Sequence, residues 1–407
     1  MIILHQDLGL NGCIIFLGKT NNYNEVMLEN NKILKVKIRV ICLLFFSNLV
    51  IGQTDSISQR IVSKINPHSE APVHSILLYL KNENNGAIYN EGFGTASKLS
   101  DAVTKQSAFK IASSTKLFVA TIILQLEEEG KLSLNDTISN YLNAIDYLDF
   151  NNLHIKDGIK YSQEITIEQL LAHRSGLADI FTDREDEFFE LLSQNPDKDY
   201  TPESIMELYY QFNLNKEPKF KPGQGWHYSD INYLLLGLII EQLDTSKLAQ
   251  SIRNRILQPL EMKHTFFEYY ENPIAEINMI HQYVGAINFS KLNTSFDWAG
   301  GGLVSTNSDL ALFIKALFNY KLINKESLAK MTAVKNTKDN ESRYGLGVYE
   351  FNINGNIYYG HFGFYNTFIG YCPASKLVLS YSISQTNPDF NTYGFVSELS
   401  ILFANKQ

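Results

Sequence analysis

The chain has 407 residues, of which 44% are hydrophobic and 19% are charged, and this balance excludes an intrinsically disordered protein. Its formal net charge is −8 and no long run of Lys or Arg follows position 60, which argues against a nucleic-acid partner, because phosphate binding needs a concentrated basic face. Only one of the three cysteines, Cys372, lies beyond the N-terminal segment, and no Cys and His residues have zinc-ligand spacing, so we expect no internal disulfide, metal ion or cofactor in the body of the chain.

The N-terminal segment has the pattern of a secretory signal peptide. A basic stretch at 32–39 precedes an apolar run at 40–51, which is short for a bilayer span but fits the apolar core of a signal peptide. Because Met27 closely precedes this pattern, we expect translation to start there, residues 1–52 to be a leader, and the mature protein to begin near Gln53. The protein is then exported to the periplasm or secreted, without a stable membrane span. An uncleaved N-terminal anchor is the alternative, since the cleavage site lacks the usual small residues.

The body of the chain, residues 53–407, contains no repeat, Pro/Ser-rich linker or low-complexity tract, which favours one compact domain. Its first elements are predicted as strands at 75–81 and 87–94, joined by the turn residues 84–86. A helix is predicted to begin at residue 113 or 114 and to end at Gly130.

The middle of the chain is predicted to be mainly helical and its end to return to strands. Helical spacing or composition occurs at 165–173, 185–193, 202–212, 231–243 and 309–318. Strand-like segments follow at 344–349, 356–359, 367–371 and 376–382, before a last helix at 393–403. We therefore predict an α+β fold with an antiparallel sheet built from both ends, flanked by helices. A mainly helical second lobe, roughly 120–300, is inserted, and a cleft between lobes is a usual place for a site.

The first candidate for chemistry is the pair Ser113 and Lys116. A serine hydroxyl is a weak nucleophile unless a base lies within hydrogen-bond reach, and residues i and i+3 share one face of a helix. Burial of Lys116 would favour its neutral amine, which can act as that base. The same spacing recurs at Ser327 and Lys330, which we interpret as a solvated helix face. Only the first pair lies at a predicted strand-to-helix junction, where the helix N-terminus favours negative charge.

The stretch 109–118 resembles the first motif of the class C β-lactamases and penicillin-binding-protein-like serine hydrolases. Further segments resemble this family in the same order, at 127–136, 170–179, 221–230, 299–310 and 360–363. The resemblance implies a β-lactamase/transpeptidase-like fold and a Ser113 acyl-enzyme. Within these segments, His173 and the glycines Gly176 and Gly300–Gly302 are interpreted as architecture.

The family's second motif, Tyr-x-Asn, is matched by Tyr228-Ser229-Asp230, and the resemblance implies that the tyrosine hydroxyl lies near the nucleophile and shuttles a proton. Two similar patterns begin at Tyr141 and Tyr270, but neither follows a Pro-Gly pair. Asp230 departs from the family's asparagine. A carboxylate there can pair with Lys116 and hold it as the ammonium, which would favour Tyr228 as the base, so the choice between the two bases stays open.

The third motif lacks lysine, since the chain contains no Lys-Thr-Gly, and His361-Phe362-Gly363 stands in its place, predicted on an edge strand. This histidine can orient substrate or Tyr228. A neutral His361 binds carboxylates weakly, which argues against a dedicated β-lactamase. The resemblance implies that the backbone N–H of Phe364 joins that of Ser113 in the oxyanion hole.

These residues predict a serine hydrolase that acts on an ester or a small peptide amide, such as an esterase, a D-Ala carboxypeptidase, a D-aminopeptidase or a β-lactamase-like enzyme. Its expected partner is a small-molecule or peptide substrate. The alternative is a catalytically silent module that keeps the fold and binds cell-wall peptides or a partner protein, motivated by Asp230 and the altered third motif. A metal-dependent hydrolase lacks the ligand spacing.

Overall fold

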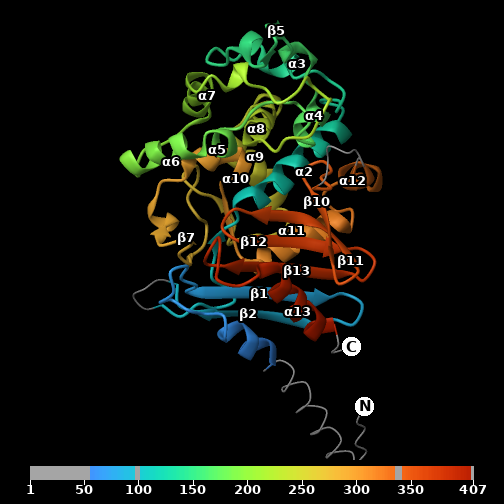
Figure 1. Ribbon diagram of the computed structural model, residues 1–407. Coiled ribbons are helices and arrows are strands. Elements are labelled where there is room, and N and C mark those ends of the chain that lie inside the picture. Colours follow the sequence, from blue (N-terminus) through green and yellow to red (C-terminus); the bar gives the residue numbers. More distant parts are fainter. Residues whose placement is uncertain (1–55, 97–100, 335–341, 405–407) are drawn as a thin grey trace, which may run out of the picture. The chain divides into compact units, whose positions relative to one another are not determined.

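The computed structural model describes residues 56–96, 101–334 and 342–404 of the chain (Figure 1). The predicted leader, residues 1–52, and its expected start at Met27 lie outside the described residues. Among the residues described, no helix combines the length and the apolar character that a membrane crossing requires. The same part of the chain holds no group of three or more His, Cys, Asp or Glu side chains placed to bind a metal ion.

The centre of the fold is a six-stranded antiparallel sheet built from the two ends of the chain, which confirms the predicted α+β class. In spatial order its strands are β10 (Tyr349–Ile353), β11 (Asn356–Gly363), β12 (Thr367–Cys372), β13 (Leu377–Ile383), β1 (Ser75–Asn82) and β2 (Ile88–Gly94). The N-terminal strand β1 pairs with the C-terminal strand β13, with Ile76 opposite Ile383.

Alternate residues of the sheet face two different cores, because successive side chains of a strand point to opposite faces. In β1, Leu77 packs into the larger core and Leu78 into the smaller one. The smaller core is closed by α13 (Thr392–Ala404), and the larger by α2 (Thr115–Glu128) and α11 (Asn307–Phe318) (Figure 1). Helices therefore cover both faces of the sheet, which explains why its central strands are buried almost throughout.

Helices also dominate the chain between β3 (Phe109–Lys110) and β9 (Leu303–Ser305), as predicted. They are α3 (Ser139–Leu142), α4 (Ile167–Leu171), α5 (Ile180–Asp183), α6 (Glu185–Gln194), α7 (Pro202–Gln211), α8 (Asp230–Asp244), α9 (Leu248–Ile252) and α10 (Trp298–Gly301), with α12 (Lys325–Thr332) following α11. Short strands complete the region: β6 (Phe266–Phe267) joins β3 and β9 in a small sheet, and two hairpins are formed by β4 (Ile155–Lys156) with β5 (Ile159–Lys160) and by β7 (Tyr283–Val284) with β8 (Ile287–Asn288).

One predicted strand is mostly absent. The segment 344–349 was expected to be extended, but β10 begins only at Tyr349. The residues before it pass over α2. Gly347 has a φ of +74°, and a Cβ there would lie 2.5 Å from the Cβ of Ala120, so this loop depends on a residue without a side chain.

Candidate active site

Ser113 lies at a sharp turn between β3 and α2. The turn is a 3₁₀ segment, Ala112–Ser114, in which Ala112 has a φ of +45°, a conformation that L-residues rarely adopt. Ala112 and Ser114 are buried, whereas Ser113 is partly exposed and lines a pocket. The geometry of the turn therefore directs this one hydroxyl toward a space that a ligand can enter.

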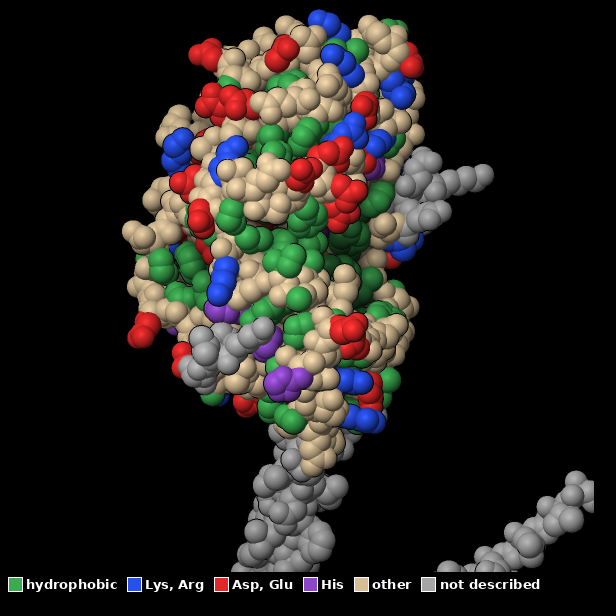
Figure 2. All heavy atoms as spheres, turned by 60° about the vertical axis from the view of Figure 1, so that its left-hand side comes forward, with side chains coloured by type: hydrophobic (Ala, Val, Ile, Leu, Met, Phe, Trp, Pro, Cys, Tyr) green, Lys and Arg blue, Asp and Glu red, His purple; other side chains and the backbone are tan. Residues whose placement is uncertain are grey.

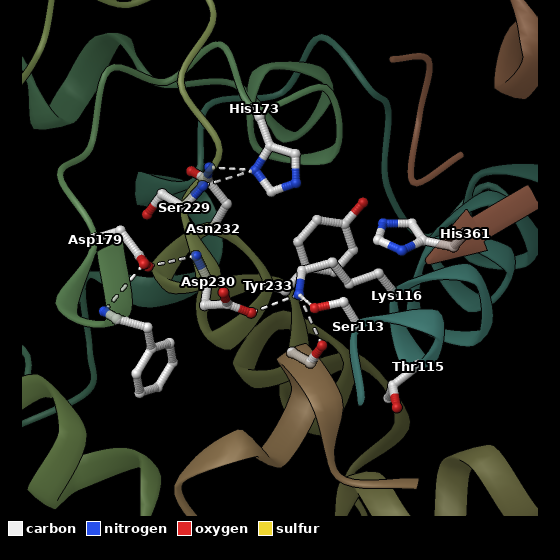
Figure 3. A network of polar contacts seen from close by, with 12 residues as sticks. Ser113, Thr115, Lys116, His173, Asp179, Ser229, Asp230, Asn232, Tyr233 and His361 are labelled. Carbon is white, nitrogen blue, oxygen red and sulfur yellow. Dashed lines mark hydrogen bonds and ion pairs between the residues drawn. The ribbon is translucent and has the colours of Figure 1, made fainter. Parts of the chain in front are cut away.

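Lys116 lies beneath Ser113 on the first turn of α2, and its side chain is fully buried (Figure 3). Its Nζ donates to the Oγ of Ser113 at 3.0 Å, to the Oδ1 of Asp230 at 2.5 Å and to the carbonyl oxygen of Gly300 at 2.8 Å. An ammonium has three N–H groups, and these three oxygens accept all of them. The geometry therefore favours the charged form of Lys116, with Asp230 as its counter-ion.

Tyr228 covers the same pair from the other side. Its hydroxyl forms a hydrogen bond with Ser113, and Nζ of Lys116 lies 5.0 Å from the centre of its ring. Burial, followed by the charge of Asp230, raises the pKa of Tyr228 well above its ordinary value, and the Ser113 hydrogen bond lowers it only in part. The resting side chain is therefore a neutral phenol that contacts the nucleophile.

Tyr228 is held in place by His173, the residue interpreted from the sequence as architecture. The two rings stack with centroids 4.2 Å apart. The Nδ1 of His173 accepts hydrogen bonds from the backbone N–H of Ser229 at 3.2 Å and from the amide of Asn232 at 3.1 Å (Figure 3). Burial, followed by the charge of Lys116, lowers the pKa of His173 well below its ordinary range, so it acts as a neutral support for this loop.

The backbone of Asp230 is fixed by a residue that the sequence analysis did not single out. The N–H of Asp230 donates to the Oδ1 of the fully buried Asp179 at 2.6 Å, while Oδ2 of Asp179 accepts from the N–H groups of Phe181 and Thr182 at 3.0 Å and caps α5. Burial and then the charge of Asp230 raise the pKa of Asp179 to about 7. The only sequence signal was its place at the end of the segment 170–179.

His361 was predicted on an edge strand, and this is wrong, because β11 lies between β10 and β12. The pairing with β10 nevertheless ends at Gly360, so among the described residues the last part of β11, beside the pocket, has a strand neighbour on one side only. The sequence pattern showed the strand but could not show where its partner ends.

Both ring nitrogens of His361 have partners within the protein. Nδ1 donates to the carbonyl oxygen of Phe362 at 2.7 Å, which requires a proton on Nδ1, and Nε2 therefore accepts from the hydroxyl of Tyr344 at 3.0 Å. Burial, followed by the charge of Lys116, lowers the pKa of His361 to about 3. In this state His361 is neutral and offers the pocket no unpaired N–H.

Gly363 brings the end of β11 against the nucleophile turn. A Cβ on Gly363 would lie 2.2 Å from the carbonyl oxygen of Ile111 and 2.2 Å from Oγ1 of Thr367, so only glycine fits. The hydroxyl of Ser114 also donates to the carbonyl oxygen of His361 at 3.0 Å. These contacts place the turn that begins with Phe364 next to Ser113, but the oxyanion role of the two N–H groups stays a prediction.

The residues predicted from the sequence surround one pocket of about 450 Å³. Six of them line it, namely Ser113, Tyr228, Asp230, His361, Gly363 and Phe364, while Lys116 lies below its floor. The remaining wall is formed by Ala112, Phe181, Thr182, Glu185, Phe188, Phe189, Leu192, Phe289, Phe296, Asp297, Tyr349, Phe362 and Tyr365. Figure 2 shows hydrophobic side chains gathered across the middle of the face that carries α5 and α6, with acidic side chains above them.

The two other Tyr-x-Asn patterns and the second Ser-x-x-Lys pattern do not line this pocket. The Tyr141 hydroxyl donates to Asp136, and that of Tyr270 donates to two backbone carbonyls. Ser327 is buried rather than solvated, because its helix is capped by Asn324 and turns it inward, while Lys330 pairs with Glu127.

Comparisons with known proteins agree with this geometry. The profile of the β-lactamase family matches residues 82–400. Protein flp of Staphylococcus aureus (strain MW2) is 33% identical over 189 residues, which cover 45% of this chain and 33% of the relative. The putative penicillin-binding protein PbpX of Bacillus subtilis (strain 168) is 28% identical over 269 residues, 65% of this chain and 60% of the relative. The chain thus spans about a third of the length of the first relative and less than two thirds of the second.

Among solved structures, the D-amino acid amidase from Ochrobactrum anthropi SV3 complexed with L-phenylalanine has a TM-score of 0.70 at 23% identity and covers 86% of this chain and 99% of its own. The penicillin binding protein from Bacillus halodurans has a TM-score of 0.66 at 22% identity, covering 80% and 96%. At these identities the structures establish the predicted β-lactamase/transpeptidase-like fold. The family match over residues 82–400 shows that the chain belongs to the β-lactamase family.

Proposed function

We propose that the protein hydrolyses an ester or a small peptide amide through an acyl-enzyme on Ser113. The observation that supports this most directly is the environment of the Ser113 hydroxyl. It opens into a pocket and contacts both the buried ammonium of Lys116 and the hydroxyl of Tyr228. A serine is activated by such an arrangement, because one neighbour can take its proton while the other stabilises the negative charge that develops.

Tyr228 is the proton carrier in this proposal. Lys116 donates all its N–H groups to oxygens and has no lone pair for a proton. As the Oγ of Ser113 attacks the carbonyl carbon, the phenol oxygen of Tyr228 accepts the serine proton and passes its own proton to the leaving group. The bond to the leaving group then breaks and the acyl group stays on Ser113. Water is activated by the same relay in reverse, which releases the acid and restores the serine.

The carbonyl oxygen of the substrate is stabilised by the backbone N–H groups of Ser113 and Phe364 in this proposal. The close packing of Gly363 against Ile111 supports it, because that contact sets the separation between the two turns. Donors fixed in advance in this way lower the barrier without reorganisation during the reaction.

Amides of amino acids and short peptides are the favoured substrates. This choice is supported by one structural neighbour that is a D-amino acid amidase, while another is a penicillin binding protein. His361 is neutral, and among the described residues no Lys or Arg lines the pocket, which disfavours a ligand that must be held by its carboxylate, as β-lactams are.

The first experiment is intact-mass spectrometry after incubation with a fluorophosphonate. We expect one adduct on the wild type, none on Ser113→Ala, and one on Ser327→Ala, the matched control at the second Ser-x-x-Lys pattern. Turnover of p-nitrophenyl acetate is measured on the same three proteins. An unlabelled wild type that also fails to hydrolyse the ester would contradict the proposal and favour a silent binding module that keeps the fold.

We also propose that the protein is exported, since the segment before residue 53 has the signal-peptide pattern. N-terminal sequencing of the protein recovered from outside the cytoplasm should begin near Gln53. A mature chain that retains Met1 would refute both the expected start and the cleavage.

A further inference from the structure

The pocket in front of Ser113 is lined by aromatic side chains and by acidic side chains. Much of its surface comes from aromatic rings, including Phe181, Phe188, Phe189, Phe289 and Phe296. The charged side chains among its lining residues are all acidic, namely Glu185, Asp230 and Asp297. Glu185 is exposed at the start of α6, and Asp230 is paired with Lys116, so these two carboxylates already have solvent or a cation as partner.

Asp297 differs from both. It is only partly exposed, and among the described residues no cation forms an ion pair with it. Lys110, the cation whose charge affects Asp297 most, is instead bound at 3.0 Å to Glu268 and at 2.8 Å to Thr294. Burial raises the pKa of Asp297 to about 7, and the charge of Lys110 lowers it only in part. A carboxylate in a largely apolar pocket without a counter-ion is an unfavourable arrangement that a cationic ligand relieves.

Asp297 also lies close to the reacting centre. It immediately precedes α10, whose Gly300 carbonyl accepts from Lys116 and whose Gly300 backbone packs against the Oδ1 of Asp230. Gly301, one residue further, packs against Asp297 itself, where a Cβ would lie 3.3 Å from Oδ1. One short helix thus connects the Asp297 carboxylate to the groups that contact Ser113. A cation held by Asp297 would therefore occupy the same pocket as the carbonyl under attack.

We propose that the substrate is an amide or ester of an amino acid with an unblocked amino group; this inference rests on the proposed serine-hydrolase function. The ammonium of the substrate pairs with Asp297, and its large apolar side chain packs among the phenylalanine rings. Because Asp297 and Ser113 line the same pocket, one small substrate can present its amino group to the first and its carbonyl group to the second. Aromatic rings add to the selection, because their faces attract ammonium groups and their area buries an apolar side chain. A ligand with a carboxylate in place of this ammonium would be repelled by the acidic side chains of the pocket.

The test compares p-nitroanilides of phenylalanine with a free amino group and with an N-acetylated one, each as D and L enantiomers. We expect the free-amine form of at least one enantiomer to have a kcat/KM about 30-fold or more above that of its acetylated form, the range for a partly buried charge pair. Asp297→Asn should reduce this ratio at least tenfold, mainly through KM. Asp186→Asn removes the same charge from an exposed position of α6 that does not line the pocket, and should leave the ratio as in the wild type.

A second measurement does not depend on turnover. Calorimetric titration of the Ser113→Ala variant should show that phenylalaninamide binds more tightly than its N-acetyl form, and that Asp297→Asn removes the difference. Equal binding of the two forms, or a ratio of kcat/KM that Asp297→Asn leaves intact, overturns the inference. If Ser113 is labelled by the fluorophosphonate while the preference is absent, the substrate class is wrong and the proposed function stands. If there is neither labelling nor turnover but the binding preference is present, the proposed function is wrong and the recognition by Asp297 stands.

Discussion

Replacement of Gly363 by alanine tests how the nucleophile turn is positioned. An added Cβ would lie 2.2 Å from the carbonyl oxygen of Ile111, two residues before Ser113, whereas ordinary contacts begin at 3.4 Å. The end of β11 must therefore move away from the turn by about 1 Å, since neither backbone can compress. Overpacking of this kind costs about 1–3 kcal/mol of stability. A displacement of about 1 Å at a reacting group also slows the chemistry by about 100-fold.

The matched control is Gly360→Ala on the same strand. Its Cβ would lie 2.1 Å from the carbonyl oxygen of Ile369, an equally hard contact, but with strand β12 instead of the nucleophile turn. Urea denaturation and the rate of fluorophosphonate labelling are measured for both variants. We expect similar losses of stability and a much slower labelling only for Gly363→Ala. Equal labelling rates in the two folded variants would refute the reasoning that Gly363 sets the geometry of the turn.

Three further predictions concern titratable side chains of the site. Tyr228→Phe removes the proton carrier but keeps the stacked ring, so turnover of p-nitrophenyl acetate should fall by about 100- to 10,000-fold with an unchanged circular dichroism spectrum. A rate within threefold of the wild type would exclude the relay. Lys116→Met leaves the Asp230 carboxylate without its counter-ion, so the free energy of unfolding should fall by about 3–5 kcal/mol and labelling should be lost; a stable, labelled variant would contradict both. Asp297→Asn should stabilise the protein at pH 8 by about 1–3 kcal/mol and little at pH 3, measured by urea denaturation. Burial raises the folded pKa of Asp297 to about 7 from 3.8, so the wild type loses stability as pH rises between these values; equal effects at both pH values would refute this.

The sheet was predictable because its strands carry a strong local signal. The run from Ser75 to Asn82 carries apolar residues on both faces, and in the run from Leu377 to Ile383 every second residue from Leu377 on is apolar. The small sheet of β3, β6 and β9 was not predictable, since its strands have two or three residues and show no periodicity. Their pairing depends on contacts between segments that are far apart in the chain. For Phe109 the partner is Ser305.

The site was predictable only where a motif gives the residue type and its spacing. The pair Ser113 and Lys116 is a local pattern on one helix face. The partners that fix Lys116 are not local: Asp230 is 114 residues away, and Gly300, 184 residues away, contributes a backbone oxygen that every residue type possesses. The residue type of Gly300 therefore could not predict this contact.

The same reason explains what was missed at the third motif. His361 was recognised by its place in the order of motifs. Its role also depends on Tyr344, which belongs to none of these motifs and lies in the loop before β10, where its hydroxyl donates to Nε2 of His361. Asp179 and Asp297 were missed because an isolated acidic residue near a helix start is usually a cap. Asp179 is a cap, and it also holds the backbone of Asp230; its second contact is visible only in three dimensions.

The charges around Ser113 explain why an aspartate at position 230 suits a cationic substrate. An asparagine there would leave the buried ammonium of Lys116 uncompensated, so that its positive field would reach the pocket and attract carboxylates. Asp230 neutralises that charge at 2.5 Å. Asp179 and Asp297 then have no cation paired with them in the part of the chain that the structure describes, and burial raises the pKa of each to about 7, so protons partly balance them at neutral pH. A substrate ammonium beside Asp297 replaces such a proton. Because the ion pair with Asp230 already neutralises Lys116, Asp297 is left to bind this ammonium, and the site selects an unblocked amino group.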